Sequence, residues 1–355
     1  MDFKAQLAAY KQAIDADIAA YAAHVRASTR AQYGTYPGVV SDGFLDLLSR
    51  GGKRIRGALV MVGYQMCGGR DTAMITRAAT AVEMMHAYIL LIDDIQDRSA
   101  LRRGKPTVHK LLETYHQRHH LKGSAAHAGV SLGLNAAMSG SHAAQMLLAG
   151  LEVEAELRLK AIGIINHTML VTAHGQTADI MNQLTPKVTR TNIDRVMEWK
   201  TAHYTFLNPL CVGMVLAGAG CESTDAIRQY ALHAGIAFQI TDDCIGLFGS
   251  KAAAGKDPMD DMREGKHTLL INYALKHSAP ADAAFLATCL GNSKITKQDF
   301  ARVKRIVKNS GAYNYARATA ARHIAVALKS LEAEKQQWEA PGVAFLEALV
   351  RHLAP

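Results

Sequence analysis

Three aspartates lie close together at the end of an apolar stretch, and two arginines follow them. Asp93, Asp94 and Asp97 stand in LLIDDIQDRSALRRG, which continues to Arg102 and Arg103. At helical spacing Asp97 shares a face with both other aspartates, and like charges so placed destabilise a bare helix. A hard cation such as Mg²⁺ would offset this repulsion through the carboxylate oxygens. Taken alone, the acidic end of a surface helix explains the same pattern.

A second pair of aspartates ends another apolar stretch about 150 residues later. Asp242 and Asp243 stand in AFQITDDCIGLFG, and Gln239 precedes them at a spacing that puts it on their helix face. Two such carboxylate sets, facing each other across a helical bundle, could hold Mg²⁺ with phosphate between the ions. Together the two segments favour a metal–phosphate site over two unrelated acidic helix ends.

Basic residues accompany both acidic segments. They are Lys53 and Arg56 after a glycine pair in SRGGKRIRG, Lys200 in MEWKTAHYT, and Lys256 and Lys266 around GKDPMDDMREGKHT. An arginine-rich patch without metal ligands suits one diphosphate, whereas a carboxylate–Mg²⁺ clamp suits another. The pattern therefore indicates chemistry on two diphosphates that are held in two different ways.

Apolar residues recur every three or four positions along most of the chain, which predicts amphipathic helices. Clear examples run from Phe3 to Val25, from Ile75 to Ile92 and from Ile227 to Thr241. Turn signals at 37–43 (PGVVSDG), 68–71 (GGRD) and 182–186 (NQLTP) are expected to separate long helices. We expect one all-α domain over residues 1–355, a bundle whose site lies between helices.

The composition argues against several classes of protein. The five cysteines show no CxxC spacing, which argues against a disulfide framework or a zinc site and for a reducing cytosol. The net charge of +9 suits small diphosphates, and without a Lys/Arg run interleaved with aromatics we expect no nucleic-acid partner. No transmembrane segment or signal peptide is expected, so we expect a cytoplasmic protein.

The ordered motifs of this chain resemble those of the trans-isoprenyl diphosphate synthases, the polyprenyl synthetase family. The motifs are GGKRIRG, HAYILLIDDIQDRSALRRGKPTVH, HGQTADI, WKTAHYT, FQITDDCIGLFG and GKDPMDDMREGKHTLL. The resemblance implies an all-α homodimer of isoprenoid synthase-type bundles, each around a central active-site cavity with three Mg²⁺ ions. It also implies head-to-tail condensation of isopentenyl diphosphate with an allylic diphosphate: dimethylallyl, geranyl or farnesyl diphosphate.

The resemblance also implies roles for individual residues. Asp93, Asp94, Asp97, Asp242 and Asp243 would hold the metals that grip the allylic diphosphate, helped by Arg102, Lys200, Lys256 and Lys266. Lys53, Arg56, His86 and Arg103 would bind isopentenyl diphosphate. Thr201 and Gln239 would lie beside the developing carbocation, and Asp179 would be structural or support the residues around it. The chain departs from the family pattern at Gly246, where a third aspartate often stands; Asp261 aligns with a later acid of the geranylgeranyl-type branch.

Product length is predicted from the residues before Asp93. Tyr88 lies five positions earlier, ~7.5 Å deeper along a helix axis, and the neighbouring Ile89 is not aromatic. A single aromatic at this depth resembles the archaeal-type geranylgeranyl synthases, so we expect a C20 product, with C15 as the alternative. If Tyr88 only packs in the core, this expectation loses its basis.

Two further motifs and two other functions fit the sequence less well. GVSLG (129–133) fits the hydrolase motif GxSxG, but its flanks indicate a helix rather than a strand and turn. His116, His119 and His120 have metal-ligand spacing without a partnering acid cluster, so a solvated helix end is favoured. A class I terpene cyclase would not need a second diphosphate site. A non-catalytic partner subunit would typically lack one or both aspartate motifs.

Overall fold

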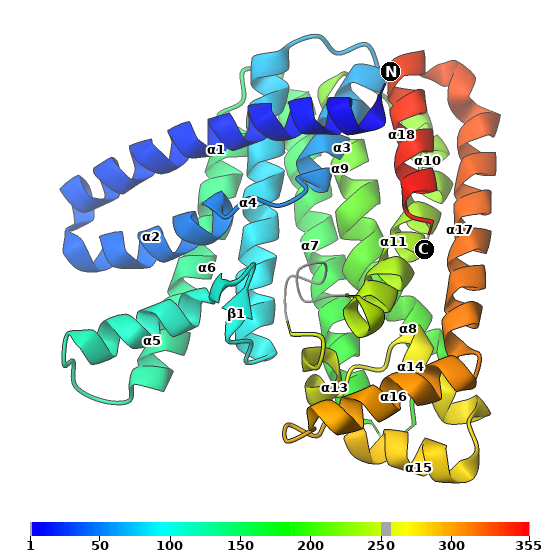
Figure 1. Cartoon of the computed structure of the whole chain (residues 1–355). Coiled ribbons are helices and arrows are strands. Elements are labelled where there is room, and N and C mark those ends of the chain that lie inside the picture. The colour runs from blue at the N-terminus through cyan, green and yellow to red at the C-terminus, as the bar shows by residue number, and fades with distance from the viewer. Residues whose placement is uncertain (1, 186, 250–256, 355) are drawn as a thin grey trace. The chain divides into compact units, whose positions relative to one another are not determined.

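The computed structural model describes residues 2–185, 187–249 and 257–354, and most of these residues are helical. The chain forms two compact units (Figure 1). The first comprises Met1–Gly163 and Val212–Gly218, and the second comprises Ile164–Cys211 and Ala219–Pro355. The all-α fold class is confirmed, and the single domain over residues 1–355 stays a prediction.

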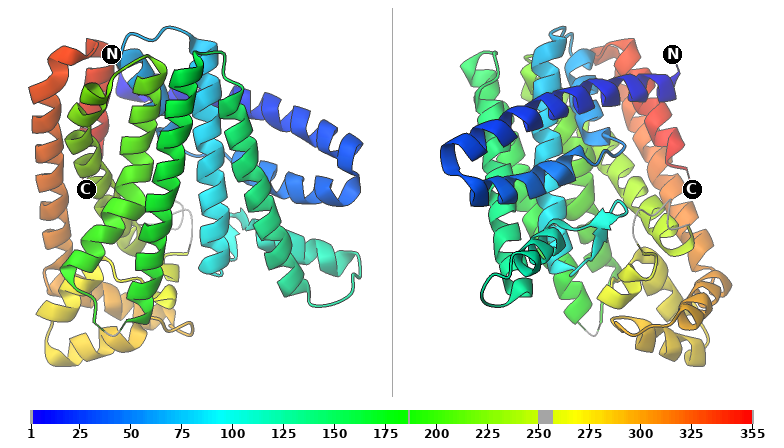
Figure 2. Two further views of the ribbon diagram at one scale, coloured as in Figure 1. Left: turned by 180° about the vertical axis from the view of Figure 1, so that it is seen from behind. Right: turned by 60° about the vertical axis from the view of Figure 1, so that its left-hand side comes forward.

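The first unit is built around one long buried helix, α4. Its elements are α1 (Phe3–Tyr33), α2 (Thr35–Ser49), α3 (Ile55–Met66), α4 (Thr72–Gln96), β1 (Leu101–Arg102), β2 (Lys105–Pro106), α5 (Val108–Arg118), α6 (Ala125–Ala149), the first residues of α7 (Ala155–Leu184) and the last residues of α9 (Asn208–Leu216). Helix α4 packs against α3 and α6, while α5 packs against α6 (Figure 2). Helices α1 and α2 form a hairpin that also contacts α4.

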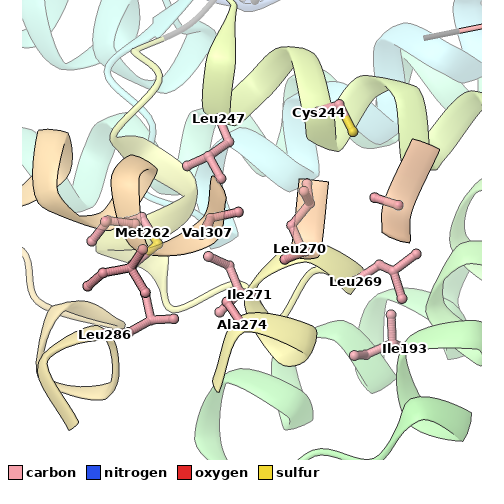
Figure 3. Close-up of a cluster of buried hydrophobic side chains, with 14 of the residues drawn as sticks. Ile193, Cys244, Leu247, Met262, Leu269, Leu270, Ile271, Ala274, Leu286 and Val307 are labelled. Atoms are coloured by element: carbon pink, nitrogen blue, oxygen red, sulfur yellow. The ribbon is translucent and has the colours of Figure 1, made fainter. Parts of the chain in front are cut away.

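The second unit is arranged around α11. Its elements, besides the rest of α7, are α8 (Arg190–Val196), the π-helix η1 (Met197–Leu207), the first residues of α9 (Asn208–Leu216), α10 (Cys221–Ala226), α11 (Arg228–Phe248), α13 (Asp260–Glu264), α14 (Leu269–His277), α15 (Pro280–Cys289), α16 (Lys297–Asn309), α17 (Ala312–Glu334), the short 3₁₀ helix η2 (Lys335–Gln337) and α18 (Ala340–His352). Helix α11 packs against both η1 and α17. Apolar side chains from α8, α11 and α13–α17 form its core, including Leu270, Ile271 and Val307 (Figure 3).

The helix predicted from the apolar repeat before the first aspartates is confirmed and extends further. The GGRD turn ends at Asp71, whose side chain accepts a hydrogen bond from Met74 N at 3.0 Å and so caps α4. Helix α4 then continues through Asp93 and Asp94 to Gln96, with Asp97 as its C-cap. The aspartate cluster is therefore held by a regular helix end rather than by a loop.

The turn predicted at 37–43 is wrong, because α2 runs through it. Pro37 occupies the first turn of the helix, where its missing N–H would have had no partner within the helix. The glycines allow close packing instead: a side-chain carbon at Gly43 would lie 3.0 Å from Val108 Cγ1. The structure also contains an antiparallel hairpin, β1–β2, which was not predicted. Each of its strands has only two residues, too few to show an alternation of apolar and polar residues in the sequence.

By length and composition, α4 could cross a membrane. However, 61% of its apolar window is buried inside the protein. The core helix of a soluble protein has the same properties, so this one helix is weak evidence for a membrane span.

Candidate active site

The acidic end of α4 is bound by an arginine from the β1–β2 hairpin. Arg102 donates hydrogen bonds to Asp94 Oδ1 from Nε at 2.8 Å and from Nη2 at 2.5 Å, and to Asp93 Oδ2 at 3.4 Å. Asp94 is 1% exposed. Burial raises the pKa of Asp94 to about 6. Arg102 opposes this shift because it stabilises the charged carboxylate, whereas the negative charges of Asp93 and Asp97 add to it.

The hairpin that carries Arg102 is itself fixed by Arg50, at the end of α2. Arg50 donates to the backbone oxygen of Arg102 at 3.2 Å and to that of Pro106 at 2.8 Å. Its own guanidinium pairs with Asp46 at 2.6 Å. The sequence does not reveal the role of Arg50, because the hairpin oxygens that it binds belong to the backbone more than 50 positions away.

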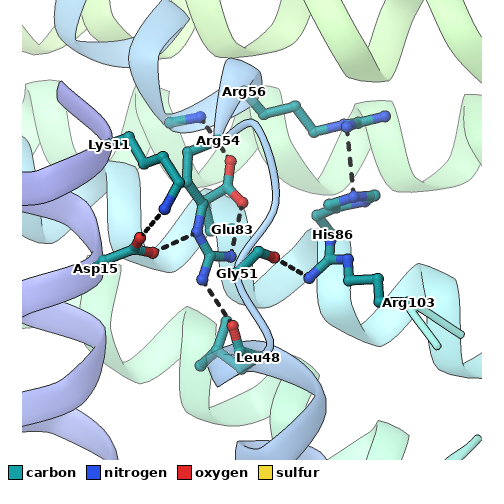
Figure 4. Close-up of polar contacts among 10 residues, drawn as sticks. Lys11, Asp15, Leu48, Gly51, Arg54, Arg56, Glu83, His86 and Arg103 are labelled. Carbon is teal, nitrogen blue, oxygen red and sulfur yellow. Dashed lines mark hydrogen bonds and ion pairs between the residues drawn. The ribbon is translucent and has the colours of Figure 1, made fainter. Parts of the chain in front are cut away.

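Three of the four residues expected to bind isopentenyl diphosphate lie around the start of α3 (Figure 4). Arg56 Nη1 donates to His86 Nε2 at 3.4 Å, and Arg103 Nη1 donates to the backbone oxygen of Gly51. Burial, followed by Arg56, Arg103 and further arginines, lowers the pKa of His86 well below its usual value, so the imidazole is neutral. Helix α3 begins only at Ile55, so Lys53 lies exposed in the loop before it.

In the second unit, three predicted residues form one hydrogen-bonded chain. Thr201 Oγ1 donates to Gln239 Oε1 at 2.6 Å, and Gln239 Nε2 donates to Asp243 Oδ1 at 2.7 Å. Thr201 comes from η1, and the other two side chains come from α11. The amide thus links the hydroxyl to the second aspartate motif.

The π-helix η1 carries both Lys200 and Thr201. Lys200 Nζ binds Asp179 Oδ2 of α7 at 2.6 Å, so Asp179 supports the lysine. A side-chain carbon at Gly175 would lie 2.3 Å from Lys200 N, so only glycine lets α7 approach η1 this closely. This contact explains the glycine of the HGQTADI motif, and π-helical turns are frequent at functional sites.

Asp243 is strongly perturbed by its surroundings. Burial raises its pKa to about 8, and nearby Asp261 adds to the shift, while Gln239 opposes it. Asp261 Oδ2 lies 3.2 Å from the position of a side-chain carbon on Gly246. The later acid therefore reaches the place where the family pattern often has a third aspartate. Lys266 lies 3.9 Å from Asp261 and pairs with Glu264 at 2.9 Å, whereas Lys256 falls outside the described residues.

The residues predicted to set product length are half-buried on α4, one turn beyond a large cavity of the first unit. Tyr88 and Ile89 are both partly accessible. Met84, one turn before Tyr88, is fully buried and lines a cavity of about 930 Å³ between α1, α2, α5 and α6. Methionine side chains are flexible, so Met84 can adapt its conformation at the wall of this cavity.

The other sequence motifs lie in ordinary helical positions. GVSLG falls inside α6, so the helical flanks predicted for it are confirmed and the strand–turn–helix of a hydrolase is not formed. His116, at the end of α5, bonds through Nε2 to the backbone oxygen of Lys122 at 3.0 Å. The ring of His119 packs at a tilt of 38° against that of Tyr115, with the ring centroids 4.1 Å apart.

Arg56, His86 and Arg103 form a basic cluster at the start of α3. Arg54 and Glu83 lie near this cluster, and neither was predicted from the sequence to belong to the site. Both are buried and joined by an ion pair at 3.2 Å. A signal was present, because Glu83 is a single acid inside the apolar helix that precedes Asp93. This signal does not identify the partner of Glu83, because Arg54 lies 29 positions earlier in the sequence.

The carboxylates fit a metal that is shared with a bound phosphate. Within the described ranges, no three His, Cys, Asp or Glu side chains are arranged as a metal site. Mg²⁺ needs no such cage, because it is usually bound by one or two carboxylates together with substrate phosphates. Asp94 Oδ2 is buried, and the described residues offer it no hydrogen-bond partner, so this oxygen could bind a cation. That the two aspartate motifs face each other stays a prediction.

Known proteins resemble this chain over most of its length. The family model described as Polyprenyl synthetase matches residues 39–309. The geranylgeranyl diphosphate synthase of Saccharolobus solfataricus is 31% identical over 270 residues, 76% of each protein. The geranylfarnesyl diphosphate synthase of Aeropyrum pernix is 29% identical over 310 residues, 85% of this chain and 91% of that protein.

A solved structure matches the whole chain. It is the geranylgeranyl pyrophosphate synthase from Corynebacterium glutamicum, complexed with isoprenyl diphosphate and magnesium. The TM-score is 0.90 at 27% identity, and the match covers 100% of this chain and 99% of that one. The chain therefore belongs to the polyprenyl synthetase family and is a prenyltransferase of the trans-isoprenyl diphosphate synthase type, similar to geranylgeranyl diphosphate synthases.

Proposed function

We propose that this enzyme condenses isopentenyl diphosphate with allylic diphosphates to give geranylgeranyl diphosphate (C20), releasing diphosphate. Dimethylallyl, geranyl and farnesyl diphosphates are the allylic substrates of the successive steps. Farnesyl diphosphate (C15) is the alternative product. The two relatives described above are a geranylgeranyl and a geranylfarnesyl diphosphate synthase, so the family alone does not choose between product lengths.

The observation that carries the proposal is the arrangement of α4. His86, beside Arg56, and Asp93, beside Arg102, lie seven residues apart on this helix. Seven residues make almost two turns, or ~10 Å, so the two side chains leave nearly the same face. One face of α4 therefore carries His86, which lies beside the guanidinium of Arg56 from α3, and, ~10 Å further along, the carboxylate of Asp93. Such an arrangement supports two diphosphates bound in different ways.

Mg²⁺ is the cofactor we propose, with three ions per active site. Asp93, Asp94, Asp97, Asp242 and Asp243 would hold it, and the magnesium in the Corynebacterium glutamicum structure supports this choice. When bound, the metal neutralises charge that develops on the leaving diphosphate. Among the described residues, the buried Oδ2 of Asp94 has no hydrogen-bond partner, and a bound cation would compensate for its burial.

The residues of the chain act on both substrates. As the allylic C–O bond breaks, its electron pair leaves with the diphosphate, whose growing charge Arg102, Lys200 and Lys266 stabilise. Arg56, His86 and Arg103, together with the exposed Lys53, hold isopentenyl diphosphate so that its double bond can attack the allylic carbocation. Loss of a proton to the departing diphosphate restores an alkene. The Thr201 and Gln239 oxygens can stabilise positive charge during this step.

Product length is proposed to be set on α4. Tyr88 would form the first obstacle to the growing tail, with Ile89 beside it and Met84 behind it. A cavity of about 930 Å³ that Met84 lines in the same unit supports this proposal. Tyr88 would therefore stop the chain at C20 although the protein has room beyond it.

The enzyme is proposed to act as a cytoplasmic homodimer. Helix α6 supports the dimer because it contains no Asp, Glu, Lys or Arg and leaves large apolar side chains exposed. Leu134 is 46% exposed, Met138 is 55% exposed and Met146 is 75% exposed. An uncharged apolar helix face of this kind is typical of an interface between subunits.

The direct test is to incubate the pure protein with Mg²⁺, isopentenyl diphosphate and each allylic primer, and to size the products. A C20 product is expected from all three primers. A C15 end product would select the alternative. Cyclic hydrocarbons, or no turnover without a second protein, would support a terpene cyclase or a partner subunit. The Arg56–His86–Arg103 group argues against the first, and the presence of both aspartate motifs argues against the second.

A further inference from the structure

The loop that precedes α3 has an unusual conformation. Arg54 lies in the left-handed region with φ 51°, and Gly51 and Gly52, which precede it in the same loop, also have positive φ. Arg54 is also 4% exposed, although its neighbour Lys53 is exposed. A buried arginine in a left-handed conformation is unfavourable unless its surroundings fix it. The contacts of Arg54 should therefore explain what this loop is for.

Arg54 is held by three helices at once (Figure 4). Nε donates to Asp15 Oδ1 of α1 at 2.8 Å, and Nη1 donates to Glu83 Oε2 of α4 at 3.2 Å. Nη2 donates to the backbone oxygen of Leu48 in α2 at 2.8 Å. Each side-chain nitrogen of Arg54 thus has an acceptor, and the loop cannot move without breaking bonds to α1, α2 and α4.

Glu83 also caps α3 from another helix. Its Oε1 accepts a hydrogen bond from Gly57 N at 2.9 Å, in the first turn of α3. Arg54, the residue in the N-cap position, makes no such bond with its own side chain. A carboxylate at a helix N-terminus satisfies a free N–H and interacts favourably with the helix dipole. Both oxygens of Glu83 are therefore used to fix the start of α3.

The fixed elements are those that carry the basic cluster. Arg56 follows Arg54 by two positions, and His86 follows Glu83 by three positions, one turn along α4. The pairs Arg54–Glu83 and Arg56–His86 therefore stand side by side between α3 and α4. Arg103 completes the group through Gly51, the first residue of the same loop.

We propose that Glu83 and Arg54 are positioning residues for the isopentenyl diphosphate site formed by Lys53, Arg56, His86 and Arg103. The buried ion pair turns Arg54 inward and fixes α3 so that Arg56 faces His86. The Glu83 carboxylate also offsets the mutual repulsion of the neighbouring guanidinium groups. This inference rests on the proposed function for the identity of the ligand, but it concerns residues that do not touch that ligand.

The test is Glu83→Gln, which keeps the size of the side chain and an oxygen for Gly57 N but removes the charge. The KM for isopentenyl diphosphate should rise about 10–100-fold, because small displacements of binding groups have effects of this size. The KM for the allylic substrate should change by less than about threefold. The matched control is Asp17→Asn, which removes another ion pair between α1 and α4, Asp17–Arg77 at 3.3 Å, and should leave both constants unchanged.

A second variant covers the case in which Glu83→Gln does not fold. Asp15→Asn weakens the more accessible end of the same network, where the Asp15 side chain is 32% exposed, and should raise the KM for isopentenyl diphosphate less strongly. A lower melting temperature with an unchanged KM in these variants would show a purely structural role and overturn the inference. Equal increases in both KM values would also overturn it.

Binding without turnover separates this inference from the proposed function. Calorimetric titration of isopentenyl diphosphate in EDTA should show weaker binding to Glu83→Gln than to the wild type, because the basic cluster needs no metal. If the wild type makes no prenyl diphosphate, the proposed function fails, and this titration still tests the inference. Equal binding by wild type and variant, or no binding by either, overturns the inference.

Discussion

The carboxylate of Asp261 lies over Gly246, with Oδ2 3.2 Å from the position of a side-chain carbon on that glycine. Gly246 is on α11, one turn beyond Asp242 and Asp243, and Asp261 is on α13. The acid that the motif lacks on its own helix is therefore supplied from a different helix. A side chain at Gly246 would have to displace it.

The first prediction follows from this contact. Asp261→Asn should reduce turnover at least tenfold and raise the Mg²⁺ concentration needed for half-maximal rate, because the site loses a carboxylate beside Asp243. Steady-state rates over a Mg²⁺ titration measure both effects. Asp260→Asn is the control, since Asp260 pairs with Arg263 at 2.9 Å instead. Equal behaviour of the two variants would exclude Asp261 from the metal site.

The second prediction concerns the two aspartate motifs. Asp94→Ala and Asp243→Ala should each lower kcat by orders of magnitude, because each removes a carboxylate proposed to hold the metal. Circular dichroism should show that the helical fold is retained. Near-normal activity with unchanged Mg²⁺ dependence in either variant would contradict the assignment of that motif.

The third prediction separates the two diphosphate sites. Arg56→Ala should raise the KM for isopentenyl diphosphate much more than that for the allylic substrate, because Arg56 lies beside His86, almost two helical turns before Asp93 on α4. Lys200→Ala should do the opposite, since Lys200 is proposed to stabilise the allylic diphosphate. Initial rates with each substrate varied in turn provide the comparison. The same ratio of KM changes in both variants would mean that the sites are misassigned.

Several parts of the fold could be predicted from the sequence because they are local. The apolar repeats predict α1, α4 and α11, because apolar residues at helical spacing place one face of each helix in the core. The turn predicted at 37–43 was wrong because one proline and two glycines in this range are local turn signals. In α2 these residues are helical instead, and the packing of the helix against its neighbours decides this. The π-helix η1 also has no distinct local pattern.

In the site, too, the sequence predicts the types of the residues but not the contacts between them. The carboxylates and arginines could be found from the motifs, but their partners could not. Thr201 and Gln239 are 38 positions apart and meet only because η1 packs on α11. Arg54 was overlooked because a buried arginine and an exposed one look alike in GGKRIRG. Its importance depends on Asp15 and Glu83, which lie on two other helices.

The fourth prediction concerns pH and a histidine pair outside the site. His233 of α11 and His323 of α17 face each other, with their Nδ1 atoms 2.7 Å apart. Burial is the main reason that the pKa of His323 is lowered from 6.5 to about 4, and the charges of His233 and Arg190 lower it further. Burial also lowers the pKa of His233, and the negative charge of Glu198 opposes that shift. A histidine with a depressed pKa stays neutral in the folded state.

The unfolded chain therefore binds more protons than the folded one between about pH 6.5 and about 4, so stability falls as the pH decreases through this range. His323→Gln should remove about 1–3 kcal/mol of this acid-induced loss in the free energy of unfolding. Urea titrations at several pH values measure it. Exposed His24→Gln is the control, and an identical pH profile for His323→Gln and wild type would contradict the account.

The last prediction concerns the product. Tyr88→Ala should give products longer than C20, because it removes the proposed obstacle to the tail, and Ile89→Phe should shorten the product towards C15. Adding Met84→Ala to Tyr88→Ala should lengthen it further, since Met84 lines the cavity of about 930 Å³. Leu90→Ala is the matched control, because two positions along α4 turn its side chain by ~200° from Tyr88. Chromatographic sizing of the dephosphorylated products gives the result. If Tyr88→Ala is active and its product stays at the wild-type length, Tyr88 does not limit the tail and the C20 assignment loses its physical basis.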